Sequence, residues 1–233
     1  KNFDRVIDVL GADHKLIGAQ LQCTMKVLNE KVPEIVFFEF VSLPEGSMST
    51  RAGKFVSADD LITEIRKRAF EEVTARRPEL PEDERRKIAA AVGLAAIRYD
   101  IVKVSPEKST VFDWKEALDF ERQSGPYIQY AHARACSILE KAGDFSECFE
   151  LETEQEIALA KQIARFPGII ERVVAELRPN LLAIYARELA DTFNSFYHFE
   201  QVLKSEGKGR DRRLTLVKAV QNTLQEALET LGI

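Results

Sequence analysis

Two short apolar runs near the amino terminus predict buried strands. Residues 5–10 and 34–41 are rich in β-branched and aromatic side chains, which favour strands. Between them, apolar residues recur at helical spacing from about Asp13, a candidate N-cap, to Asn29. A strand, a helix and a second strand at this spacing indicate one βαβ crossover. The unbroken run Ile35–Phe38 is typical of a strand buried on both faces of a parallel sheet.

After residue 56 the pattern is helical almost throughout. Ser57 with Asp60 resembles a capping box, and Pro81 is expected at the first position of a helix. The predicted helices cover residues 57–77, 81–99, 112–118, 126–141, 154–165, 168–177, 180–203 and 212–231. The chain is therefore predicted to be mixed, with a partial α/β segment followed by an all-α bundle joined by short loops.

Two charged segments interrupt the helical half. Residues 144–156 contain acids and no base, and we interpret them as a solvated connection. A basic run follows later in the chain, formed by Lys204, Lys208, Arg210, Arg212 and Arg213. We interpret it, too, as a solvated connection, with contact to an RNA backbone as the lesser alternative.

Composition narrows the class of protein without naming it. The net charge is 33 − 38 = −5, so any polyanion must be held by local patches and stacking. The sequence shows no apolar stretch long enough to span a membrane and no signal-peptide pattern, and we expect a cytoplasmic protein, without membrane association and monomeric. The cysteines Cys23, Cys136 and Cys148 have no metal-ligand spacing, so we expect buried reduced thiols and no metal site.

The loop Ser47-Met48-Ser49-Thr50-Arg51-Ala52-Gly53-Lys54 is a candidate phosphate site. It joins the second predicted strand to the first long helix. Arg51 and Lys54 offer positive charge, Ser49 and Thr50 offer hydroxyl donors, and Gly53 lets the backbone approach a ligand. Small polar loops of this kind are common, so by itself the loop is more simply a solvated connection.

The predicted sheet places this loop beside a second polar segment. Ligands of open α/β sheets bind beyond the carboxyl ends of the strands, so Gly11–His14 and Ser47–Lys54 should face one site. A single crossover cannot cover both faces of a parallel sheet. We therefore expect the chain to be the carboxyl-terminal piece of a longer protein, beginning inside a nucleotide-binding domain.

Several segments, in order, resemble arginyl-tRNA synthetases over nearly the whole chain. The segment Tyr127-Ile128-Gln129-Tyr130-Ala131-His132-Ala133-Arg134 is the most specific. The others are Gly11-Ala12-Asp13-His14, Met48-Ser49-Thr50-Arg51 with Gly53, Ala91-Val92-Gly93, Phe112-Asp113-Trp114, and Leu228-Glu229-Thr230-Leu231-Gly232-Ile233. The family's His-x-Gly-His loop is absent and is expected upstream of residue 1. Ser47 stands where the family often has lysine, which leaves Arg51 or Lys54 to supply the cation.

The resemblance implies a Rossmann-like class I synthetase fold and its reaction. Residues 1–57 would be the end of the catalytic domain, 58–110 connecting helices, and 111–233 a helical anticodon-binding domain. The family ligates L-arginine to tRNA(Arg) with ATP, accompanied by Mg²⁺ as a substrate complex, through an arginyl-adenylate. Catalysis then consists of alignment and charge stabilisation, with no tightly bound cofactor.

The resemblance also assigns site residues. Met48, Ser49, Thr50, Arg51 and Lys54 would bind ATP, with Arg51 and Lys54 as the catalytic cations. His14 would border the arginine pocket. The residues that would contact the anticodon loop are Tyr127, Tyr130, Arg134 and Tyr197.

Spacing alone leaves other interpretations open. His14 could be a satisfied polar residue at a helix start, and aromatic residues three apart on a helix are more often core. We assign Phe193 and Phe196 to the core. A non-catalytic tRNA-binding or interaction module derived from a synthetase is the alternative function, and a gene that extends upstream through a His-x-Gly-His loop would exclude it.

Overall fold

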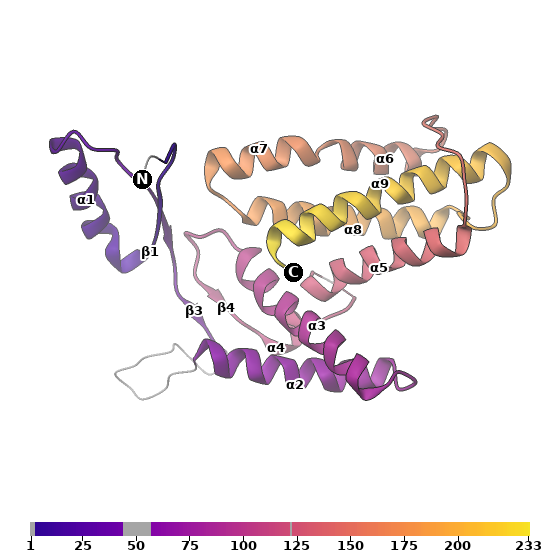
Figure 1. Cartoon of the computed structure of the whole chain (residues 1–233), viewed down its shortest axis with the longest axis horizontal. Helices are drawn as coiled ribbons and strands as arrows, with labels where there is room; N and C mark the ends of the chain where they lie inside the picture. The colour runs from indigo at the N-terminus through magenta and orange to yellow at the C-terminus, as the bar shows by residue number, and fades with distance from the viewer. Residues whose placement is uncertain (1–2, 44–56, 122) are drawn as a thin grey trace. The chain divides into compact units, whose positions relative to one another are not determined.

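The computed structural model describes residues 3–43, 57–121 and 123–233. The chain divides into two compact units (Figure 1). Unit 1 consists of Lys1–Phe55 and Val104–Asp113, and unit 2 consists of Val56–Lys103 and Trp114–Ile233. The domain boundaries drawn near residues 57 and 110 remain predictions.

Unit 1 contains the predicted crossover. Its elements are β1 (Ile7–Gly11), a 3-10 helix η1 (Ala12–His14), α1 (Lys15–Val27), β2 (Glu34–Phe38), β3 (Val41–Ser42) and β4 (Thr110–Val111). β1 and β2 are parallel, with Ile7 opposite Glu34 and Gly11 opposite Phe38. α1 lies close to β2 at Gly18, because a Cβ there would come within 2.9 Å of the side chains of Ile35 and Phe37.

Three expectations for unit 1 were wrong in detail. The second strand ends at Phe38, because the chain leaves β2 and pairs again as β3, parallel to β4. Both strands are less buried than expected, since Val9 of β1 is 63% and Phe38 of β2 is 47% exposed. Asp13 does not cap the helix; it lies within η1, and the N-cap of α1 is His14, without a side-chain cap bond.

Unit 2 is helical, as predicted. Its helices are α2 (Ala58–Arg76), α3 (Glu82–Val102), α4 (Trp114–Ala117), α5 (Gly125–Ala142), α6 (Glu154–Ala164), α7 (Phe166–Glu176), α8 (Asn180–Phe199) and α9 (Gly207–Leu231). The capping box of Ser57 and Asp60 is confirmed, whereas Pro81 is the N-cap of α3 rather than its first residue. α5 begins in tight contact with α3, because a Cβ on Gly125 would lie 2.4 Å from the carbonyl oxygen of Ala95.

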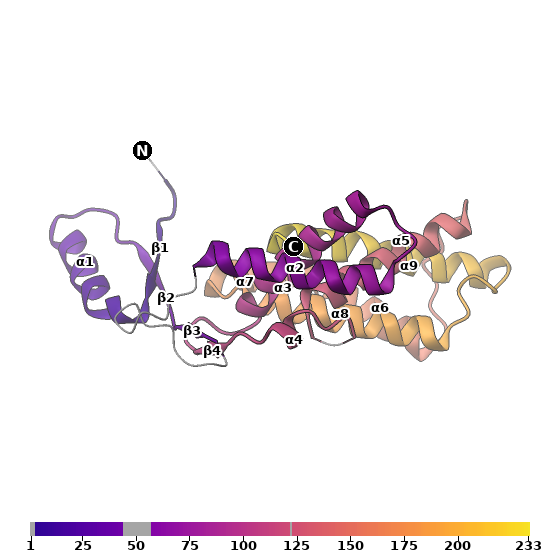
Figure 2. The same ribbon diagram turned by 90° about the horizontal axis from the view of Figure 1, so that it is seen from below.

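One apolar core joins the carboxyl-terminal helices. α5, α8 and α9 run alongside one another in both views, and α6 and α7 pack on α8 (Figures 1 and 2). The largest buried side chains include Tyr185, Phe193, Phe196, Leu189 and Leu214, all at most 1% exposed. The assignment of Phe193 and Phe196 to the core is confirmed, and their burial fixes the rotation of α8 about its axis.

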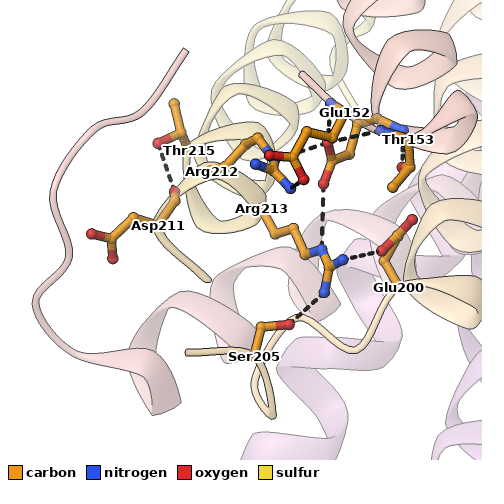
Figure 3. Close-up of polar contacts among 9 residues, drawn as sticks. Glu152, Thr153, Glu200, Ser205, Asp211, Arg212, Arg213 and Thr215 are labelled. Atoms are coloured by element: carbon orange, nitrogen blue, oxygen red, sulfur yellow. Dashed lines mark hydrogen bonds and ion pairs between the residues drawn. The ribbon is translucent and has the colours of Figure 1, made fainter. Parts of the chain in front are cut away.

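The two charged segments are solvated connections only in part. Most of residues 144–155 are exposed, as are Lys204 and Lys208, but the interpretation is wrong for Glu156 and Arg212. Glu156 is fully buried and Arg212 is 3% exposed. Glu156 Oε2 lies 2.9 Å from Arg212 Nε, and its Oε1 lies 3.3 Å from Arg213 Nε. Glu152 and Glu200 neutralise the other ends of the two guanidinium groups, at 2.7 Å from Arg212 and 2.6 Å from Arg213 (Figure 3).

This ion-pair network ties the start of α6 to α9 because its acids and bases meet in space. Glu156 also closes a capping box with Thr153 and accepts the backbone N–H of Glu152 at 2.8 Å. Burial alone would raise the pKa of Glu156, but these backbone N–H groups and the Arg212 guanidinium outweigh it, so the pKa lies below its ordinary value.

The cysteines differ from expectation. Cys23 is exposed, and Cys136 and Cys148 are half-buried, although all three are free thiols as predicted. Within the described part of the chain, none of the helices combines the length and apolarity needed to cross a membrane.

Candidate functional site

Helices α5 and α8 bring four predicted residues together in unit 2. Tyr127, Tyr130 and Arg134 lie at i, i+3 and i+7 on α5, and Tyr197 lies on α8. Tyr130 is 50% exposed, while the other three are half-buried. We call these four residues, with Asp191 and Asn194 of α8, the tyrosine–arginine cluster.

Aromatic rings flank the guanidinium of the cluster. Arg134 Cζ lies 4.7 Å from the centre of the Tyr130 ring and 5.6 Å from that of Tyr197. Both distances are within the range of cation–π attraction. Tyr197 in turn packs on buried Phe193, with ring centres 6.5 Å apart. The Tyr197 ring is therefore packed against the core, and Arg134 lies near both this ring and the exposed ring of Tyr130.

Hydrogen bonds hold the polar ends of the cluster. The Tyr127 hydroxyl donates to Asp191 Oδ1 at 2.8 Å and accepts from Asn194 Nδ2 at 2.9 Å. Arg134 donates to Asn194 Oδ1 at 2.6 Å. Arg187, also on α8, donates to the other carboxylate oxygen of Asp191 at 2.6 Å. These bonds connect the two helices through side chains.

Tyr127 stays a neutral phenol. Burial is the largest cause that raises its pKa; the Asn194 hydrogen bond opposes it, and the Asp191 carboxylate raises it further. A neutral Tyr127 hydroxyl has one proton, which it donates to Asp191, and a lone pair that accepts from Asn194, in agreement with both hydrogen bonds.

The cluster combines an exposed aromatic ring with a neighbouring guanidinium, and hydrogen bonding to Asn194 holds the guanidinium in place. This combination suits a nucleic acid with unpaired bases. Aromatic faces stack on bases of any sequence, and a guanidinium can bind a phosphate while it stacks. A double helix would hide the base faces from such a surface. The chemistry therefore favours a single-stranded loop.

Unit 1 places His14 where the strands end. His14 closes η1, directly after the carboxyl end of β1, and its side chain is 49% exposed. Its Nδ1 lies 3.0 Å from Asp13 Oδ1. Because β1 and β2 are parallel, the ends of both strands meet at this edge. The role of His14 beside an arginine pocket stays a prediction.

The candidate ATP loop belongs to the part of the sequence between β3 and α2. Met48, Ser49, Thr50, Arg51 and Lys54 lie outside the described residues. Their proximity to His14 and their contact with ATP and Mg²⁺ therefore also stay predictions.

Asp191 and Asn194 were missed by the sequence analysis. Both lie on α8 at three-residue intervals before Tyr197, which places them on the same side of the helix. That spacing was the available signal. Their partners on α5 are sixty or more residues away in the sequence, so these contacts became visible only in the fold.

Comparisons with known proteins agree with this arrangement. The family model described as "tRNA synthetases class I (R), catalytic domain" matches residues 2–114, and the "DALR anticodon binding domain" matches residues 128–233. The second match contains the whole tyrosine–arginine cluster except Tyr127.

Whole proteins and solved structures of the same kind are also similar. The chain is 81% identical to an arginine–tRNA ligase of Methanoregula boonei and 76% identical to that of Methanospirillum hungatei, covering all of this chain and 42% of each relative. The arginyl-tRNA synthetase structure of Thermus thermophilus is 33% identical, with a TM-score of 0.90, over 98% of this chain and 40% of that one.

The chain thus spans less than half the length of the relatives it matches. The catalytic-domain match begins in the short α/β segment, and the anticodon-binding match covers the helices that end the chain. The chain belongs to the arginyl-tRNA synthetase family and corresponds to its carboxyl-terminal portion, the end of the class I catalytic domain followed by the DALR anticodon-binding domain.

Proposed function

We propose that this chain binds the anticodon loop of tRNA(Arg) at the tyrosine–arginine cluster and contributes one loop to the ATP site of an arginyl-tRNA synthetase. The whole enzyme would join L-arginine to tRNA(Arg) through an arginyl-adenylate. The observation that carries the proposal is the cluster itself, an exposed ring with a supported guanidinium beside it, lying in and beside the segment that matches an anticodon-binding domain.

The cluster offers separate groups to a base and to the RNA backbone. Tyr130 presents a half-exposed ring on which an unstacked base can lie. A guanidinium has five N–H donors, so Arg134 can hold Asn194 and still donate to a phosphate. This local charge matters because the chain as a whole is negative, and its overall field does not attract RNA.

In the catalytic portion, the chemical character of each side chain suggests its role toward ATP or arginine. The cations Arg51 and Lys54 would stabilise charge on the triphosphate as the arginine carboxylate attacks the α-phosphorus. Met48, Ser49 and Thr50 would line the same nucleotide. Mg²⁺ would arrive with ATP, and His14 would face the amino acid. Every such contact aligns reactants and balances charge.

Tyr130→Ala tests the role of the exposed ring. Loss of one stacked base should weaken binding of tRNA(Arg) by roughly 1–2 kcal/mol, or about 5- to 30-fold, as measured by fluorescence anisotropy or filter binding. The melting curve should remain cooperative, because Tyr130 is already half exposed to solvent.

A matched control is Phe149→Ala. Phe149 is also an exposed aromatic residue, 79% accessible, but lies in the connection between α5 and α6, outside the cluster. It should leave the affinity unchanged. Equal affinities for all three proteins would contradict the assignment of Tyr130 and return it to a structural role.

A second experiment addresses catalysis by the 233 residues alone. We expect no ATP–pyrophosphate exchange with arginine and tRNA present, because these residues contain one loop of the nucleotide site and no His-x-Gly-His segment. A longer chain that includes such a segment should restore exchange. Robust exchange by the 233 residues would refute this part of the proposal while leaving tRNA binding in place.

A further inference from the structure

Asn194 contacts both the phenol and the guanidinium of the tyrosine–arginine cluster. Its amide nitrogen donates to the Tyr127 hydroxyl at 2.9 Å, and its amide oxygen accepts from Arg134 at 2.6 Å. Burial of the neighbouring Phe193 and of Phe196 on α8 fixes the rotation of this helix, so Asn194 is held toward α5. One side chain thereby constrains two others, on a different helix.

The chemistry of the site requires an amide at this position. Arg134 can only donate hydrogen bonds, so it must meet the amide oxygen. The nitrogen then points at Tyr127, whose single proton goes to Asp191. A carboxylate at position 194 would still attract Arg134. The Tyr127 hydroxyl, however, would then lie between two carboxylates and has only one proton to donate, so one of the two would receive no hydrogen bond from it. A methyl group would satisfy neither partner.

Holding Arg134 in place has a consequence for binding. Arginine has many rotamers, and fixing a long side chain on association costs affinity. In the structure the guanidinium already lies against the rings of Tyr130 and Tyr197, and the bond to Asn194 restricts it to that place. The stacking surface is then formed before a ligand arrives.

We propose that Asn194 is a positioning residue for tRNA binding, acting by holding Arg134 and Tyr127 in the geometry that receives the RNA. This inference rests on the proposed function of the cluster. Asn194 need not touch the RNA itself; its effect passes through its two partners. No role in stacking or in phosphate contact is assigned to it.

A double-mutant cycle tests this inference. Asn194→Ala should weaken tRNA(Arg) binding by about 3- to 10-fold. In an Arg134→Ala background the same substitution should have a smaller effect, because only one of its two partners, Tyr127, is left for Asn194 to position. Asn194→Asp, which keeps the attraction to Arg134 but not the donation to Tyr127, should recover part of the affinity.

The control is Ser195→Ala, which changes the next residue of the same helix at an exposed position. It should leave affinity and melting unchanged. Undiminished binding by Asn194→Ala, or losses from Asn194→Ala and Arg134→Ala that simply multiply, would overturn the positioning role. If Arg134→Ala and Tyr130→Ala both bind as tightly as the parent chain, the proposed function fails, and the inference fails with it.

Discussion

Glu156→Gln is expected to lower the free energy of unfolding of the helical unit by about 3 kcal/mol. Glu156 is fully buried, and its carboxylate faces two guanidinium groups, one of them only 3% exposed. The amide removes the counter-charge and leaves Arg212 and Arg213 to Glu152 and Glu200 alone. Urea unfolding followed by circular dichroism at neutral pH measures the loss.

The matched control is Glu154→Gln, which removes the same charge from the same first turn of α6 at an exposed position. It should cost well under 1 kcal/mol. A loss for Glu156→Gln no larger than that of the control would show that the buried network contributes nothing to stability.

The same network predicts a pH dependence. The pKa of Glu156 is lower in the folded chain than its ordinary value, so its ionised form favours folding. This contribution is complete above about pH 4.3, the ordinary pKa of glutamate, and is lost as the pH falls from there through the lowered pKa of the folded state. Glu156→Gln should therefore lose less stability on acidification than the parent chain.

Arg134→Ala is expected to weaken tRNA(Arg) binding about 10- to 100-fold, the larger of the two binding effects on α5. The change removes a charge, takes away the donor to the Asn194 amide oxygen, and removes the group that contacts the rings of both Tyr130 and Tyr197. If Arg134 also meets a phosphate, the slope of log affinity against log salt should fall by about 1. Binding titrations at several salt concentrations give both values.

Two variants separate the causes of this loss. Arg172→Ala removes a positive charge from an exposed position on α7 and should not change affinity. Arg134→Lys keeps the charge without the planar guanidinium and should recover the salt slope more than the affinity. Equal losses from Arg172→Ala and Arg134→Ala would mean that only net charge is involved.

Helices were predictable from the sequence because their information is local. Ser57 and Asp60 cap α2 as their spacing indicates, and the apolar spacing of α5, α8 and α9 matches the faces that they bury. The strands were less accurate. An apolar run through residue 41 does not show that the chain leaves β2 at Phe38 and pairs again with residues near 110.

Charged residues were misread because their partners are distant in sequence. Arg213 meets Glu156 across 57 residues, so each charge run, taken alone, resembled a solvated face. Asn194 was overlooked for the same reason, since its importance comes from Tyr127 and Arg134 on another helix. The spacing on α5 could be interpreted correctly as a shared face because all three residues lie within two turns.

The affinity of this chain for tRNA(Arg) whose anticodon bases have been removed, compared with intact tRNA(Arg), tests the account most directly. If the tyrosine–arginine cluster receives those bases, the abasic tRNA should bind at least about 10-fold more weakly, and Tyr130→Ala should cause no further loss with it. Equal binding of intact and abasic tRNA, or an unchanged effect of Tyr130→Ala on the abasic form, would contradict the assignment of this surface to the anticodon loop.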